Sequence, residues 1–226
     1  MKLVIFDCDG TLVDSQNAIL SAMEHAFTAL GLAVPERGKV LGVIGLSLPE
    51  AFAVLAPRQS ARVQAELAQL YRADFPRVRP EAVAHDPLFS GVGAAVEALA
   101  RRNDVVLGIA TGKSRRGVAR LLDREGWQEH FFTIQTADDH PSKPHPSMIL
   151  RAMAETGVAS AATIMVGDTT FDMEMARNAG VGAVGVAWGY HPPEHLVHAG
   201  AHAVAETCEA LVATVDRQLA AQEGGR

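Results

Sequence analysis

Cysteine and long apolar runs are scarce in this sequence, and each scarcity excludes a class of protein. The two cysteines in 226 residues, Cys8 and Cys208, give neither a disulfide framework nor the paired spacing of a zinc site. The longest apolar stretch, around residues 181–190, is interrupted by glycine and is far shorter than a membrane span. We therefore expect a protein of the reduced cytoplasmic compartment with no membrane partner.

Basic residues are also outnumbered. Lys and Arg total 20 against 26 Asp and Glu, so the formal net charge at pH 7 is −6. A nucleic-acid-binding domain normally carries a basic stripe, so nucleic acid is not the expected partner. The hydrophobic share of 48% is ordinary for a folded chain, and the length fits one large domain or two small ones. A monomer is the default expectation.

The stretch that organises the chain lies at its beginning. Residues 3–6 (LVIF) form an apolar run that predicts a strand buried on both faces, and Asp7 and Asp9 follow it directly. Side chains two residues apart on an extended segment point the same way, toward the strand end where open α/β sheets bind ligands. Two adjacent carboxylates repel each other, so the pair favours a hard divalent cation such as Mg²⁺. The alternative is a solvated turn that happens to contain aspartate.

A helical block follows between about residues 16 and 83. Apolar residues recur there at helical spacing and predict helices over 19–30, 51–56 and 63–71, with no strand. Ser15 is placed to cap the first helix, and residues 47–50 (SLPE) have the form of a capping box. Pro76 and Pro80 are expected to end the third helix.

Strands and helices then alternate to the end of the pattern. Strands are predicted at 105–110, 131–135, 163–166 and 183–187, and the helices between them at 91–102, 115–125, 147–155 and up to residue 178. Such alternation implies a parallel sheet with helices on both faces. The expected fold class is therefore α/β, a doubly wound Rossmann-like core with a small all-helical insertion after its first strand.

Polar residues lie where several of these strands end. Carboxylates, phosphate-binding groups and one cation converge on a single crevice: Asp7, Asp9, Thr111, Gly112, Lys143, Asp168 and Asp172. Clustered acids favour a hard cation, the backbone N–H groups at a helix start can hold phosphate oxygens, and a lysine neutralises a phosphoryl group. Together these are the parts that phosphoryl transfer requires.

These motifs resemble those of the haloacid dehalogenase (HAD) superfamily. Residues 7–15 (DCDGTLVDS) match its first motif, Thr111 the second, Lys143-Pro144 the third and residues 167–172 (GDTTFD) the fourth, all in family order. The helical block falls where the family inserts its C1 cap, as in subfamily IA members that resemble phosphoglycolate phosphatase. The resemblance implies a catalytic core of residues 1–15 and 84–226 and a cap of residues 16–83.

The resemblance also implies a role for each matched residue. Asp7 would be the nucleophile that forms an aspartyl-phosphate, and Asp9 the general acid and base. Phosphate would be bound by Thr111, Gly112 and Lys143. Mg²⁺ would be held by Asp7, the backbone carbonyl of Asp9, Asp168 and Asp172, the last directly or through an intervening ligand. The implied activity is hydrolysis of a small phosphorylated metabolite, phosphoglycolate-like or a sugar phosphate.

Other activities on the same scaffold were compared. A 2-haloacid dehalogenase and a phosphonatase are disfavoured, because those relatives lack the acid found here at Asp9. A phosphomutase of the β-phosphoglucomutase type shares every motif and stays open. A non-catalytic binding protein is disfavoured, since the nucleophile and the metal acids are present.

Several further residues are assigned to ordinary structural roles. Lys113, Arg115 and Arg116 are expected on a solvated face, the alternative being contact with a substrate anion. Surface positions are expected for His191, His195 and His198, the alternative being a transition-metal site. Trp188 and Tyr190 are expected either to pack in the core or rim or to line the crevice. The loop 42–46 resembles the segment of the cap that determines substrate specificity, but its apolar residues name no substrate.

Overall fold

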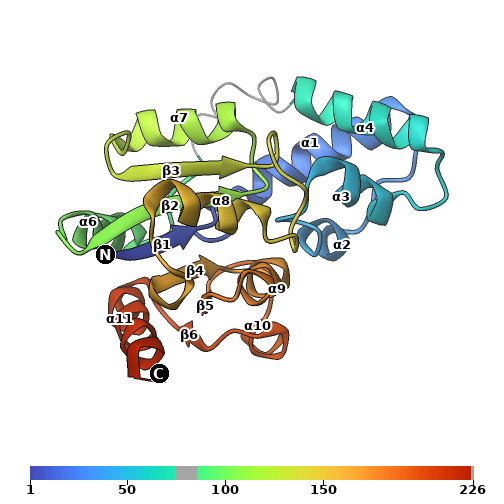
Figure 1. Cartoon of the computed structure of the whole chain (residues 1–226). Coiled ribbons are helices and arrows are strands. Elements are labelled where there is room, and N and C mark those ends of the chain that lie inside the picture. Colours follow the sequence, from blue (N-terminus) through green and yellow to red (C-terminus); the bar gives the residue numbers. More distant parts are fainter. Residues whose placement is uncertain (75–85, 225–226) are drawn as a thin grey trace.

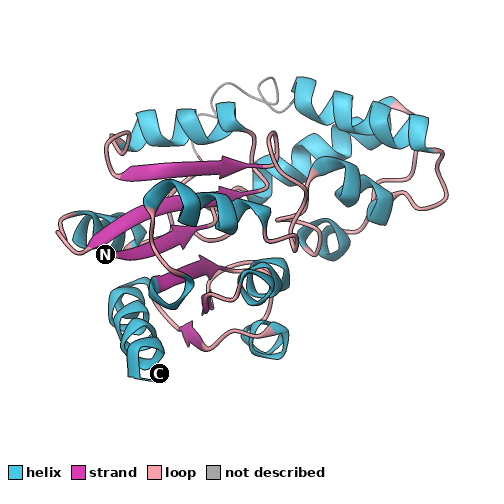
Figure 2. Cartoon of the chain, in the orientation of Figure 1, coloured by secondary structure: helices cyan, strands magenta, loops and turns pink. Residues whose placement is uncertain are grey.

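The computed structural model describes residues 1–74 and 86–224, and its centre is a six-stranded parallel sheet (Figures 1 and 2). The strand order is β3-β2-β1-β4-β5-β6. The strands are β1 (Lys2–Phe6), β2 (Val105–Thr111), β3 (Phe131–Thr136), β4 (Thr163–Gly167), β5 (Gly182–Val186) and β6 (Ala203–Ala205). The predicted α/β class is confirmed, and β1 lies at the middle of the sheet.

Helices cover both faces of this sheet. One apolar cluster joins one face to α6 (Val92–Ala100), α7 (Arg115–Glu125) and α11 (Cys208–Gly224). A second joins the other face to α8 (Ser147–Thr156), α9 (Thr170–Ala179) and α10 (Pro193–Ala199), and a short 3-10 turn, η1 (Ser160–Ala162), leads into β4. The two-sided covering explains why each predicted strand is an almost unbroken apolar run.

Strand β1 shows how the sequence pattern builds these two layers. Leu3 and Ile5 belong to one cluster, whereas Val4, Phe6 and Cys8 belong to the other. All five are fully buried, so Cys8 is a small core residue, as its place between two aspartates predicts. Alternate side chains of β1 therefore pack into the two clusters, and this packing holds the strand on both faces up to the residue before Asp7.

The helical insertion after β1 has a core of its own. It contains α1 (Gln16–Ala29), α2 (Arg37–Leu41), α3 (Leu48–Leu55) and α4 (Ala61–Asp74). Phe52 is fully buried at its centre, with ring centroids 6.0 Å from Phe27 and 6.3 Å from Tyr71. The insertion lies beyond the carboxyl ends of the strands (Figure 1). The domain boundaries stay a prediction, and the boundary near residues 83–84, Pro76 and Pro80 lie outside the described residues.

Both predicted serine caps are wrong in detail. Ser15 precedes α1 with ψ of 3°, not extended, and its side chain makes no cap hydrogen bond. Its N–H and hydroxyl instead contact the Tyr190 hydroxyl, at 3.0 and 3.2 Å. Ser47 donates its hydroxyl to the Glu50 carboxylate, so it caps no backbone N–H of α3.

Several short or late elements were not predicted. These are α2, α10, β6 and α11. Within the described ranges, no helix is both long enough and apolar enough to cross a lipid bilayer.

Candidate active site

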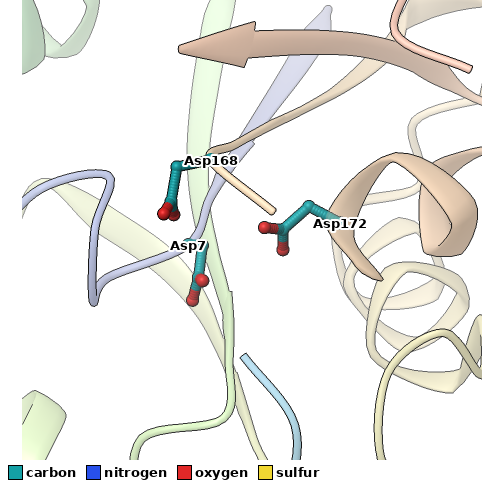
Figure 3. Close-up of side chains that lie close together, drawn as sticks. All are labelled: Asp7, Asp168 and Asp172. Atoms are coloured by element: carbon teal, nitrogen blue, oxygen red, sulfur yellow. The ribbon is translucent and has the colours of Figure 1, made fainter. Parts of the chain in front are cut away.

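Three carboxylates meet at the carboxyl edge of the sheet. Asp7 follows β1, Asp168 follows β4, and Asp172 lies in the first turn of α9. Figure 3 shows these side chains close together, and one carboxylate oxygen of each lies within 4.8 Å of the others. All three residues are buried. The structure thus brings together three of the acids that the sequence places in one crevice.

Asp7 is held rigidly by its neighbours. Its N–H donates to the Val166 carbonyl at 3.0 Å, and its Oδ1 accepts from the Cys8 N–H at 2.7 Å. Oδ2 is buried and accepts no hydrogen bond, although Lys143 Nζ lies 3.0 Å away. Burial raises the pKa of Asp7 to about 6, an effect that Lys143 opposes and Asp172 reinforces.

Lys143 bridges two of the acids. The loop after β3 carries it into the interior, where Nζ lies 3.0 Å from Asp7 Oδ2 and 2.7 Å from Asp172 Oδ1. Burial favours the neutral amine, but the Asp172 and Asp7 charges outweigh that effect and raise the pKa of Lys143. Its ammonium is therefore retained in the site.

Asp172 is fixed by the start of α9 as well as by Lys143. Thr169 and Asp172 form a capping box, in which Asp172 Oδ2 accepts from the Thr169 N–H at 3.1 Å and its hydroxyl at 2.7 Å. Because Lys143 occupies Oδ1, both oxygens of Asp172 are already engaged. Asp172 is thus the most fully bonded acid of the three.

Asp168 is held from two other segments. Its Oδ1 accepts from the Thr11 hydroxyl at 2.8 Å, and its Oδ2 accepts from the Tyr190 N–H at 2.9 Å. Burial, together with the Asp172 and Asp7 charges, raises the pKa of Asp168 well above its ordinary value. A Cβ on Gly10, whose φ is +86°, would lie 2.1 Å from Asp168 Oδ2, so only glycine fits there.

Asp9 does not join the three-acid cluster. Its Oδ1 accepts from Lys113 Nζ at 2.6 Å, and Asp86 lies 3.9 Å from the same ammonium. The side chains of Lys113 and Asp9 are only 10% and 14% exposed, so the prediction of a solvated Lys113 is wrong. Arg115 and Arg116 are exposed as predicted.

The cluster fits a hard divalent cation. Three buried carboxylates face one buried ammonium, and Asp7 Oδ2 lacks a hydrogen bond although it is buried. An oxygen-only donor set of this kind suits Mg²⁺ better than a transition metal. Burial, reinforced by repulsion between the acids, raises the pKa values of Asp7 and Asp168, and a cation would oppose both effects.

A cavity of about 620 Å³ opens between the acids and the helical insertion. Asp7, Asp9, Thr111 and Gly112 line its floor. The insertion supplies an apolar wall that includes Ile19, Met23, Val40, Val43, Ile44 and Leu46. The predicted specificity loop therefore does border the cavity. A Cβ on Gly112 would lie 2.9 Å from the Gly45 carbonyl, so sheet and insertion approach closely here.

Residues after β5 support the site through specific contacts that were not predicted. The Trp188 indole N–H donates to the Thr11 carbonyl at 3.1 Å, and Tyr190 contacts both Asp168 and Ser15. His191 is half-buried and accepts from the Thr170 N–H at 3.1 Å, so its predicted surface position is wrong. His195 and His198 are exposed as predicted.

Known proteins resemble the chain over most of its length. A family model described as "Haloacid dehalogenase-like hydrolase" matches residues 4–186. A protein of Dickeya dadantii named "Probable phosphatase IndB" is 40% identical over 93% of this chain and 91% of its own length. A phosphoglycolate phosphatase of Agrobacterium fabrum is 30% identical over 83% and 81%.

The fold also matches solved structures. A haloacid dehalogenase-like hydrolase, SP0104 from Streptococcus pneumoniae, superposes with a TM-score of 0.81 and 26% identity, covering 94% of this chain and 97% of the other. The family match, the fold and the acid cluster all indicate the same family. The chain belongs to the haloacid dehalogenase-like hydrolase family.

Proposed function

We propose that this chain is a Mg²⁺-dependent phosphatase that hydrolyses a small phosphomonoester through an aspartyl-phosphate on Asp7. The observation that carries the proposal is the setting of Asp7. Its carboxylate is buried beside Lys143, keeps one oxygen without a hydrogen bond, and borders a cavity large enough for a metabolite.

Asp7 would act as the nucleophile toward phosphorus, and Asp9 would donate and accept the proton. A carboxylate oxygen of Asp7 attacks phosphorus, the bond from phosphorus to the leaving oxygen breaks, and Asp9 gives that oxygen a proton. Water then attacks the phosphorus of the aspartyl-phosphate and passes a proton to Asp9, which releases inorganic phosphate and restores Asp7. The presence of both acids on the cavity floor supports this division.

The phosphoryl oxygens would be held by Thr111, the Gly112 N–H and Lys143. Thr111 and Gly112 border the cavity at the end of β2, and Lys143 reaches Asp7 from the β3 side. The Lys143 ammonium would balance charge on the transferring group and keep Asp7 oriented.

The metal would be bound by Asp7, Asp168 and the backbone carbonyl of Asp9. Asp172 Oδ1 lies 2.7 Å from the Lys143 ammonium, whereas the partners of Asp168 are the uncharged Thr11 hydroxyl and Tyr190 N–H, which favours a role for Asp172 in orienting Lys143 and the surrounding ligands. When bound, Mg²⁺ supplies electrostatic stabilisation of the charge on the phosphoryl oxygens.

Phosphate release from a panel of phosphomonoesters tests the proposal. The panel should include phosphoglycolate, because a relative bears the name phosphoglycolate phosphatase, and several sugar phosphates. We expect release that requires Mg²⁺, stops with EDTA, and falls by at least about 10³-fold in Asp7→Asn. Asp123→Asn, which changes an exposed aspartate on α7, is the matched control.

Two outcomes would contradict the proposal. One is phosphate release that Asp7→Asn leaves unchanged. The other is transfer of the phosphoryl group to a second hydroxyl with no inorganic phosphate formed, which is the reaction of a mutase.

A further inference from the structure

The cavity extends beyond the part that a phosphoryl group needs, and three arginines line that remainder. Arg116 and Arg120 come from α7, and Arg72 comes from α4 of the insertion. All three are exposed. None of them forms a salt bridge with any residue between 1 and 74 or between 86 and 224.

Arg115 provides an internal contrast on the same helix. Its guanidinium lies 2.5 Å from Asp139, and it does not line the cavity. Carboxylates also pair with several other arginines of the described chain, namely Arg101, Arg102, Arg124 and Arg151. Arg115 therefore has an acid partner, whereas the three cavity arginines have none within residues 1–74 and 86–224.

The acids that border the same cavity already have partners. Asp9 is bound to Lys113, the Glu50 carboxylate accepts the Ser47 hydroxyl, and Asp138 accepts the Arg115 N–H at 2.8 Å. These contacts leave the charge of Arg116 and Arg120 available to a ligand.

The position of α7 places these charges close in sequence to Thr111 and Gly112, the proposed phosphate-binding residues. The helix begins four residues after Thr111, and Arg116 and Arg120 stand one turn apart on one face, about 6 Å along the axis. A guanidinium recognises carboxylate and phosphate groups with two parallel hydrogen bonds. A molecule whose phosphate lies at Thr111 could extend along α7 toward both side chains.

We propose that Arg116 and Arg120, assisted by Arg72, bind a second anionic group on the leaving group of the substrate. The substrate class is then a phosphomonoester in which a carbon spacer separates the reacting phosphate from a carboxylate or a second phosphate. This inference rests on the proposed phosphatase function and specifies its substrate.

Matched ester pairs test the inference. Each pair has the same carbon chain, of two to six carbons, ending either in a methyl group or in a carboxylate, and a third series ends in phosphate. We expect at least about a tenfold higher kcat/KM for an anionic ester at its best chain length. The preferred end group distinguishes carboxylate from phosphate. Arg116→Gln and Arg120→Gln should each reduce that preference at least fivefold, whereas hydrolysis of the methyl-ended ester stays the same.

Arg115→Gln is the control, because it removes a neighbouring exposed guanidinium that does not line the cavity. Equal kcat/KM within every pair would overturn the inference, as would an equal loss of preference in the control. If no ester is hydrolysed, the proposed function fails but the inference is still tested, by equilibrium binding of the same pairs. Tighter binding of the anionic member, lost in Arg116→Gln, would support it, and equal binding would overturn it.

Discussion

The two sides of the cavity are built in opposite ways. On the sheet side, Asp7 borders the cavity, and Asp168 and Asp172 lie buried next to it; each of the three contacts a group from another part of the chain. On the side of the insertion and α7, the wall is apolar and is edged by exposed arginines that pair with no acid in the described part of the chain. The acids are therefore bonded mostly within the protein, with Asp7 Oδ2 as the exception, whereas the charges of the arginines are left for a ligand.

This difference separates the reaction from the choice of substrate. A buried cluster held by hydrogen bonds and ion pairs keeps the reacting groups at fixed positions, and this suits a single type of reaction. An apolar wall with a few free charges can be changed residue by residue without disturbing that cluster. Relatives that share the acids can therefore differ in the leaving group that they accept.

The largest effect should come from removing Lys143, the cation of the acid cluster. Lys143→Met leaves Asp7 and Asp172 buried without their ammonium, which we expect to lower the free energy of unfolding by about 3 kcal/mol and to abolish activity. Urea unfolding at pH 7 in EDTA measures the loss. Lys39→Met, at an exposed lysine of α2, should change stability little. If Lys143→Met changes the free energy of unfolding by less than about 1 kcal/mol, the acid cluster does not need the lysine to offset the repulsion between its carboxylates.

Metal addition should give the next largest effect. Mg²⁺ at 100 times its dissociation constant would stabilise the fold by about 2.7 kcal/mol, a rise in Tm of roughly 5–10 °C. Asp168→Asn should remove most of this rise, because it deletes a charge from the cluster. Asp123→Asn should keep it. Thermal unfolding with and without Mg²⁺ measures this rise in Tm. If Asp168→Asn shows the same rise, the metal binds elsewhere.

The smallest effect is expected at Lys113, where the two sides meet. Lys113→Met removes a contact of 2.6 Å to the Asp9 carboxylate, so kcat/KM should fall by about tenfold. The unfolding free energy should fall by less than in Lys143→Met, because the Lys113 and Asp9 side chains are 10% and 14% exposed and not fully buried. Steady-state kinetics on the best ester of the panel measures this. Arg115→Met is the matched control. Unchanged kcat/KM would mean that Asp9 needs no positioning cation.

Local patterns in the sequence were sufficient for the sheet and for much of the acid cluster. β1 was predictable because four apolar residues precede Asp7, and Asp172 because residues 167–172 directly follow the predicted strand at 163–166. Lys143 was different, since its place in a loop before a proline suggested a phosphate-binding cation but not its contacts with Asp7 and Asp172. The structure places it between two of the predicted acids.

Contacts between distant segments were not predictable from the sequence. Lys113 pairs with Asp9, and Tyr190 contacts Ser15 through 175 residues of separation. No local spacing encodes such a pair, so Lys113 was assigned to solvent and Ser15 to a helix cap. The short α2 and β6 escaped prediction for a related reason, because they carry too few residues to show a period.

The central position of β1 also determines when the chain can fold. Lys2 is opposite Val105 and Leu3 is opposite Thr163, so neither neighbour of β1 exists until those later strands have been synthesised. Pairing over such separations requires loop closure before any ladder bond forms, which slows folding and leaves an apolar strand exposed meanwhile. Asp7 lies near the beginning of the sequence, yet its surroundings are among the last to assemble.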